Sequence, residues 1–244
     1  MRIAVLVASL LVGANAAAYI PAAVYLLDRL VETRHEQGLR SIKVTQRTTL
    51  HGSGEPAVCP ETVYYATPWK MRSELRLESG TLVTLRDGAL LRVEEPGKTA
   101  KTVRTPLPDL MAEFFACADE SEDSGRERLL ADLTAYGIDV KKRTLTRWDG
   151  RIAVLIGADP WDPKSPQVYL DKDGYFPLRF VFRERAGNAD RLVDVRLLGY
   201  GGAKTGGWYP EVIEIYVDGV LTRRSVVDGI ELSPKLAPAL FKVK

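Results

Sequence analysis

Four Asp-Gly dipeptides separate pairs of short segments with alternating apolar residues, and this pattern constrains the fold more than any other feature of the chain. They are Asp87-Gly88, Asp149-Gly150, Asp173-Gly174 and Asp218-Gly219. Asp-Gly is favoured in two-residue β-hairpin turns, because both turn positions need a positive φ. Repeated turns of this kind predict an antiparallel meander. The predicted strands do not alternate with helices, which argues against a doubly wound parallel sheet.

The predicted strands cover most of the chain after residue 40. The clearest spans 70–78, where Met71, Ser73, Leu75 and Leu77 alternate with charged residues, as on a sheet with one face in water. The other predicted strands are 41–50, 62–66, 82–86, 89–94, 140–148, 151–157, 167–170, 178–183, 191–200, 211–217 and 220–227.

Three helices are predicted beside the strands. In 21–36, apolar residues recur at helical spacing after Pro21, which suits a first turn. A second helical region begins at Pro106 and has an apolar stripe, and a third covers 125–136. The stripe consists of Leu107, Leu110, Met111, Phe114 and Phe115. No linker divides the strands, so we expect one sheet packed by helices in a single domain, residues 19–244.

Residues 1–18 have the layout of a cleaved secretory signal peptide. Arg2 precedes an apolar run over 3–13, and Ala14-Asn15-Ala16 is a small-residue cleavage site. A spanning helix needs roughly 20 apolar residues, so this run alone is short for one. Because 16–27 is also rather apolar, an uncleaved membrane anchor stays open as the alternative. Export would place the protein outside the cytoplasm, away from ATP, NAD and cytosolic reductants.

Charge and cysteine content restrict the partners further. The chain has 34 Lys and Arg against 32 Asp and Glu, with both signs interspersed. Without a basic stripe, nucleic acid is not an expected partner. Cys59 and Cys117 are the two cysteines, and in an exported chain an even number favours a disulfide between them. Two buried thiols are the alternative.

Catalytic patterns are weak throughout the sequence. His35 and His51 have no neighbouring ligand set for zinc, so no metal site is predicted. The loop 199–205 has Ala203 where a phosphate loop needs its glycine, and a strand follows, so no nucleotide is expected. We therefore predict a protein that is not an enzyme and needs no cofactor. A hydrolase with dispersed carboxylates stays open, because paired carboxylates can be recognised only in space.

Apolar side chains exceed catalytic groups on the predicted strands and on the second helix. They lie where they could line a hydrophobic cavity, although an ordinary core has the same periodicity. The candidate lipid-binding residues are Tyr65, Met71, Leu75, Leu91, Met111, Phe114, Phe180 and Phe182.

Three stretches resemble the periplasmic outer-membrane lipoprotein carrier superfamily, the LolA/LolB-like lipoprotein-sorting proteins. Residues 41–49 look like the family's opening strand after a short amphipathic helix. Residues 67–88, from Thr67-Pro68-Trp69-Lys70-Met71-Arg72 to the Asp87-Gly88 turn, are similar to its proline-then-basic strand and following hairpin. Residues 208–219, beginning Trp208-Tyr209-Pro210, are similar to a late strand, and 230–241 fits the closing segment.

This resemblance implies an α+β fold that is mostly β. A strongly curved antiparallel sheet, or incomplete β-barrel, would be closed by a few helices around a hydrophobic cavity. The implied function is a periplasmic, non-enzymatic carrier or binding protein for acyl chains or lipoproteins, with a membrane-bound donor or acceptor and transfer to the outer membrane. The alternative is an envelope structural or signalling module that binds a protein partner by its sheet edge or loops.

Overall fold

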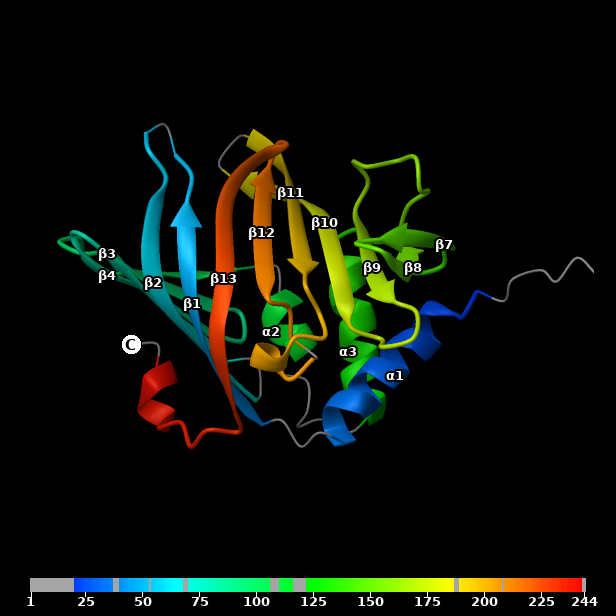
Figure 1. The fold of residues 1–244 in the computed structure, drawn as a ribbon, viewed down its shortest axis with the longest axis horizontal. Coiled ribbons are helices and arrows are strands. Elements are labelled where there is room, and N and C mark those ends of the chain that lie inside the picture. Colours follow the sequence, from blue (N-terminus) through cyan, green and yellow to red (C-terminus); the bar gives the residue numbers. More distant parts are fainter. Residues whose placement is uncertain are drawn as a thin grey trace, which may run out of the picture.

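The chain is built around one antiparallel sheet of 13 strands, which the computed structural model shows as a curved and open surface (Figure 1). The structure describes residues 20–36, 40–52, 54–67, 70–105, 110–115, 122–186, 189–207 and 209–242. The predicted signal peptide, residues 1–18, lies outside the described residues. The strand order is β6-β5-β4-β3-β2-β1-β13-β12-β11-β10-β9-β8-β7.

Two meanders form this sheet, and they meet where the first strand pairs with the last. The first meander comprises β1 (Ser41–Leu50), β2 (Ala57–Ala66), β3 (Lys70–Leu77), β4 (Gly80–Asp87), β5 (Leu90–Glu94) and β6 (Lys101–Arg104). The second comprises β7 (Arg143–Trp148), β8 (Arg151–Ile156), β9 (Gln167–Asp171), β10 (Pro177–Ala186), β11 (Ala189–Leu198), β12 (Val212–Val217) and β13 (Val220–Leu232). Since β6 and β7 lie at opposite ends of the strand order, the sheet stays open. The predicted fold class, a curved antiparallel sheet with helices, is confirmed.

Within the described residues, three α-helices lie against one face of the sheet, which we call the inner face (Figure 1). They are α1 (Ala23–Glu36), α2 (Leu110–Phe115) and α3 (Glu122–Ala135). The last two connect the two meanders, and α3 also packs against α1. No helix in the described ranges is long and apolar enough to cross a membrane.

The Asp-Gly turns behave as their chemistry predicts at two positions. Asp149 and Gly150 have φ values of 47° and 75°, and Asp218 and Gly219 have 50° and 83°. Positive φ at both central residues is the signature of the type I′ hairpin turn. The connection at Asp173-Gly174 is longer, because β9 ends at Asp171 and β10 begins at Pro177. There the carboxylate of Asp171 accepts the backbone N–H groups of both Asp173 and Gly174.

The main core lies between the helices and strands β8 to β11. The rings of Phe114 and Phe180 are 5.0 Å apart, and both side chains are no more than 1% exposed. Phe115 packs on Tyr209, with ring centroids 4.6 Å apart. Other fully buried members come from α1, α3, β8 and β9. They are Leu26, Leu27, Leu30, Leu129, Leu133, Val154, Ile156, Val168 and Leu170. Burial of this apolar surface is the main force that holds the helices on the sheet.

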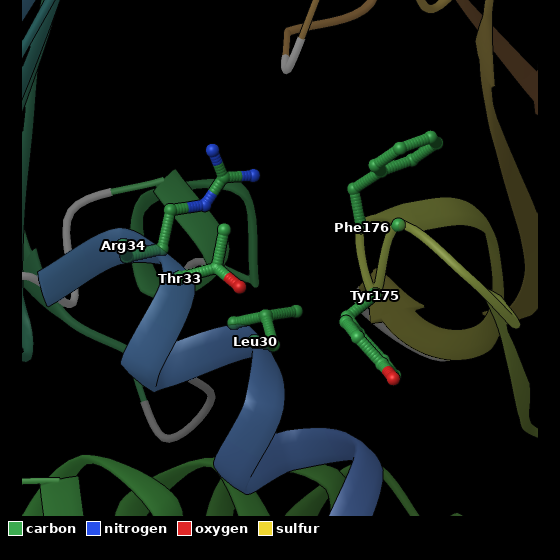
Figure 2. A pocket seen from close by; sticks show the side chains of 6 residues that line it. Leu30, Thr33, Arg34, Tyr175 and Phe176 are labelled. Carbon is green, nitrogen blue, oxygen red and sulfur yellow. The ribbon is translucent and has the colours of Figure 1, made fainter. Parts of the chain in front are cut away.

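Helix α1 docks on the turn between β9 and β10 (Figure 2). Leu30, Thr33 and Arg34 face Tyr175 and Phe176 across a gap of only about 20 Å³. The Arg34 guanidinium lies 5.3 Å from the centre of the Phe115 ring, and the residue is 3% exposed. This contact explains how a buried arginine is accommodated in an otherwise apolar helix face.

The opposite, outer face of β3 and β4 is covered by the C-terminal segment. The 3₁₀ helix η3 (Pro238–Phe241) contacts both strands. Arg72 Nη1 donates to the Leu240 carbonyl at 3.1 Å, and Val83, Leu85 and Phe241 are buried. This cover fixes the curved first meander from outside.

Three strands differ most from their predictions. Strand β6 was not predicted, because all of its residues are exposed and its sequence has no apolar period. Strand β2 begins at Ala57, ahead of Pro60. Strand β3 pairs with β2 only from Glu61 onward, so Pro60 lies on an edge, where proline is tolerated. Strand β13 continues past Gly229 to Leu232, with a register shift opposite Thr45 and Gln46.

Candidate functional site

A cavity of about 250 Å³ lies on the inner face of the sheet, beside the main core. Strands β1 to β4, strands β12 and β13, helix α2 and the segment before β12 contribute its walls. The apolar lining residues are Val63, Tyr65, Met71, Met111, Tyr209, Ile213 and Ile215. The polar lining residues are Gln46, Glu61, Ser73, Thr84, Arg223 and Ser225. The cavity is therefore amphipathic.

Strand register explains why these side chains meet. Residues directly opposite one another on antiparallel strands share a face of the sheet. Tyr65 on β2 is opposite Met71 on β3, and Val63 is opposite Ser73. Met111 reaches the same cavity from α2. This part of the apolar wall is thus made by two neighbouring strands and by a helix of the connection between the two meanders.

The polar wall is centred on Glu61, whose side chain has no exposed surface. Arg223 Nη2 lies 2.5 Å from both carboxylate oxygens. The hydroxyl groups of Thr48 and Ser73 each donate to the carboxylate at 2.5 Å, and Gln46 Nε2 donates at 2.7 Å. A carboxylate can only accept hydrogen bonds, so all of these contacts satisfy its ionised form.

These contacts determine the ionisation of Glu61. Burial alone would raise the pKa of this carboxyl, since it disfavours the charged form. The positive charge of Arg223 and the hydrogen bonds from Ser73, Thr48 and Arg223 act in the other direction. Their combined effect is larger, and the pKa of Glu61 is lowered. The cavity wall therefore holds a carboxylate that stays ionised near neutral pH.

The eight candidate lipid-binding residues occupy three different environments. Tyr65, Met71 and Met111 line the cavity. Phe114 and Phe180 are in the main core, and Phe182 packs beside it, 4.9 Å from the Tyr136 ring.

The remaining two candidates lie on the inner face of the first meander. Leu75 is opposite Glu61 and 3% exposed. Half-buried Leu91 is opposite Arg86, which itself is opposite Met71, so it continues the row that contains Tyr65. That any of the eight contacts a lipid stays a prediction.

Sequence reasoning missed the polar wall. Its signal was present on β2, where Cys59, Glu61, Val63 and Tyr65 alternate with outward residues, so that a charged residue interrupts an inward apolar series. A carboxylate at such a position needs a buried partner. The partner, Arg223, lies on β13, and nothing local in the sequence links the two.

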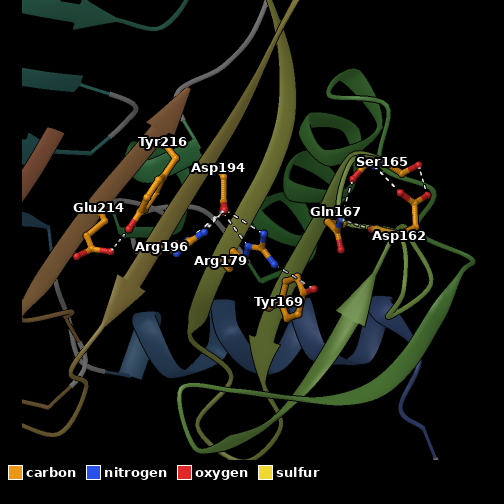
Figure 3. Close-up of polar contacts among 9 residues, drawn as sticks. All are labelled: Asp162, Ser165, Gln167, Tyr169, Arg179, Asp194, Arg196, Glu214 and Tyr216. Carbon is orange, nitrogen blue, oxygen red and sulfur yellow. Dashed lines mark hydrogen bonds and ion pairs between the residues drawn. The ribbon is translucent and has the colours of Figure 1, made fainter. Parts of the chain in front are cut away.

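A second, larger groove of about 520 Å³ lies on the outer face. Its lining is mostly charged, with Arg179 and Arg183 on β10 and Asp194 and Arg196 on β11. Figure 3 shows that Arg179 and Arg196 both contact Asp194. Arg179 Nε donates to Asp194 Oδ1 at 2.7 Å. Such walls do not suit an acyl chain, since they would have to lose their hydration. These contacts connect β10 to β11.

Metal and disulfide chemistry gain no support from the described side chains. Within those ranges, no group of three or more His, Cys, Asp or Glu is arranged to hold a metal ion. Cys59 is buried on β2, and it forms no disulfide with another of the described residues. Cys117 lies outside the described residues, so the Cys59–Cys117 bridge stays a prediction.

Solved structures share this architecture at low sequence identity. A domain from Vibrio parahaemolyticus that is named for outer membrane lipoprotein sorting matches with a TM-score of 0.57 and 13% identity, over 89% of this chain and 95% of that chain. A LolA superfamily protein from Nitrosomonas europaea matches with 0.52 and 15%, over 92% and 99%. A DUF1329 family protein from Desulfovibrio piger matches with 0.51 and 10%, over 91% and 98%. No family model and no curated protein matches the sequence. The fold is LolA-like, as the sequence predicted.

Proposed function

We propose that this protein is a periplasmic, non-enzymatic binding protein or carrier for acyl chains, free or attached to a lipoprotein. One observation supports this most directly, an amphipathic cavity of about 250 Å³ on the inner face of a LolA-like sheet. Its apolar wall offers the surface that a hydrocarbon chain needs, and its lining includes half-buried side chains such as Met71 and Ser73. The structures with this fold include one named for lipoprotein sorting.

The size of the cavity fits part of one chain. A cavity of about 150 Å³ can hold benzene, so a space of about 250 Å³ accommodates a short hydrocarbon segment. Each buried methylene contributes about 0.8 kcal/mol, so about five contribute about 4 kcal/mol, close to a millimolar dissociation constant. A longer chain requires the cavity to widen. Met71 and Met111 suit such a change, because methionine side chains are unbranched and adaptable.

This proposal includes the processing of the chain. Residues 1–18 would direct export and be removed, and residues 19–244 would form one domain in the periplasm. A shuttle between membranes has to be released, whereas a fixed acceptor does not. The mass of the protein isolated from the envelope fraction distinguishes these cases, because a retained segment leaves the full-length mass. Titration of thiols in denatured, unreduced protein tests the disulfide at the same time.

Native mass spectrometry and lipid extraction of the purified full chain test the binding function. We expect lipid at a stoichiometric level in the wild type and much less in Met71→Asp, because a charge in the apolar wall opposes a hydrocarbon chain. Val58→Asp is the matched control, since Val58 is 64% exposed on the neighbouring strand β2. Wild-type protein that carries no lipid and binds no fluorescent apolar probe would refute the proposal.

A second candidate, a module that binds a protein partner, is favoured by the open sheet. Strand β6 pairs only with β5 in the described part of the chain, so its outer edge is available for another strand. Lys101 and Arg104 lie at its two ends, and charged residues on an edge discourage pairing. Loss of a copurifying protein on Val103→Pro, from a protein that carries no lipid as the wild type, would favour this candidate over the carrier.

A further inference from the structure

The ion pair at the cavity wall carries an inference about the polar end of the ligand. Glu61 is fully buried, whereas the Arg223 side chain is 32% exposed and lines the cavity. The carboxylate already receives donors from β1, β3 and β13. The negative charge of Glu61 thus balances the positive charge of Arg223 inside the protein.

Arg223 nevertheless keeps a donor for a ligand. A guanidinium has five N–H groups. Nη2 is bonded to Glu61, and Nε is directed to Ser225 Oγ at 3.5 Å. In the described part of the chain, Nη1 has no acceptor. The apolar wall of Tyr65, Met71 and Met111 belongs to the same cavity. An amphiphile can therefore place its chain on this wall and an oxygen atom near Arg223.

The charge balance determines which oxygen is preferred. An ionised carboxylate at Arg223 would share one guanidinium with the buried carboxylate of Glu61, and like charges that share a site disfavour each other. A neutral carbonyl accepts the same hydrogen bond without adding charge. We propose that the cavity selects acyl chains whose polar end is a neutral ester or amide carbonyl over free fatty acids, an inference that rests on the proposed acyl-chain binding.

Displacement of the neutral fluorescent probe 1-N-phenylnaphthylamine compares laurate with methyl laurate, which have the same chain, below their aggregation limits at pH 8. We expect methyl laurate to bind more tightly to the wild-type protein. Any apolar cavity would bind methyl laurate more tightly than laurate, because the ester is the less polar ligand. The wild-type preference therefore serves as the reference for the variants. If neither ligand nor probe binds, the proposed function itself fails.

Glu61→Gln separates charge balance from simple partition. Once Arg223 has lost its anionic partner, laurate should bind about tenfold more tightly, because a charge-assisted bond replaces a repulsion, while methyl laurate changes little. An unchanged ratio between the two ligands in a variant with a native circular dichroism spectrum would overturn the inference.

Arg223→Lys provides an independent measurement if Glu61→Gln does not fold. Lysine keeps the ion pair with Glu61 but replaces the fork of the guanidinium with a single ammonium group. Methyl laurate should then bind about fivefold more weakly, since a hydrogen bond contributes about 1 kcal/mol, and the hydrocarbon-like probe should lose less affinity than the ester. Equal loss for both, or no loss for the ester, would contradict the inference.

Discussion

Strands β8 to β11 and strands β2 and β3 have the same alternation of apolar residues, but their inner faces have different surroundings. On β8 to β11 the inner face is covered by α1, α2 and α3, and Phe180 is 1% exposed. On β2 and β3 the inner face borders a cavity, and Met71 and Ser73 are only half-buried. The inner face of β8 to β11 is therefore a packed core, whereas the inner face of β2 and β3 is an unfilled surface with a buried ion pair. The difference comes from whether helices cover the inner face of each strand. The apolar pattern along the strand does not show this.

The largest expected effect is the loss of Phe180 from the packed half. Phe180→Ala should lower the free energy of unfolding by about 3–5 kcal/mol, because a well-packed site cannot collapse around the missing ring. Chemical denaturation measures this loss. Phe182→Ala, two residues along the same strand and half-buried, is the matched control and should lose less. Probe affinity should be unchanged in both folded variants, since neither residue lines the cavity. Weaker probe binding by folded Phe180→Ala would place the binding surface in the core.

The next effect belongs to the ion pair of the cavity half. Glu61→Gln leaves Arg223 without its counter-ion, and loss of one partner from a buried pair costs about 3–5 kcal/mol. We expect the lower end, about 3 kcal/mol, because the Arg223 side chain is 32% exposed and can be hydrated. Urea unfolding at pH 7 gives the value. Wild-type stability in this variant would mean that the ion pair does not hold the two meanders together.

The same pair should make stability depend on pH. The pKa of Glu61 is lowered in the folded state by Arg223 and by hydrogen bonds that outweigh burial. Its contribution is therefore complete above the unfolded pKa, about 4.3, and is lost as pH falls through the lower folded value. The difference in unfolding free energy between wild type and Glu61→Gln should shrink between pH 6 and pH 3. A constant difference over this range would show that Glu61 is not the group that titrates.

Sequence reasoning succeeded where the determinants are local. The turns at Asp149-Gly150 and Asp218-Gly219 depend on positive φ at two adjacent residues, so the strand ends next to them were predicted correctly. Strand β6 has no buried face and so leaves no apolar pattern.

The site depends on contacts that are distant in sequence. Glu61 and Arg223 lie on β2 and β13, and the β1–β13 pairing that joins the two meanders brings them together. Met71 and Phe180 both fit an inward apolar position. Only the location of α2 and α3 leaves one beside the cavity and buries the other.

A smaller effect, on binding, should follow from shortening the apolar wall. Met71→Ala should weaken the apolar probe about tenfold, which corresponds to about 1.4 kcal/mol, because Met71 contributes cavity surface directly. Its unfolding free energy should change less than that of Phe180→Ala, since the side chain already borders empty space. Fluorescence titration and denaturation of the same preparations provide both values. Tighter probe binding would instead show that Met71 blocks the cavity.

The smallest effect should come from Leu91, which marks how far the binding surface extends. Leu91 continues the inward row of Tyr65, Met71 and Arg86 but lies on β5, outside the cavity lining. Leu91→Ala should therefore change probe affinity less than twofold, equivalent to about 0.4 kcal/mol. Titrations with probes of increasing chain length test this boundary. A loss of affinity in Leu91→Ala that grows with chain length and approaches that of Met71→Ala would show that long chains pass over Arg86 toward the open β6 edge. The cavity would then be one end of a groove that continues across the first meander.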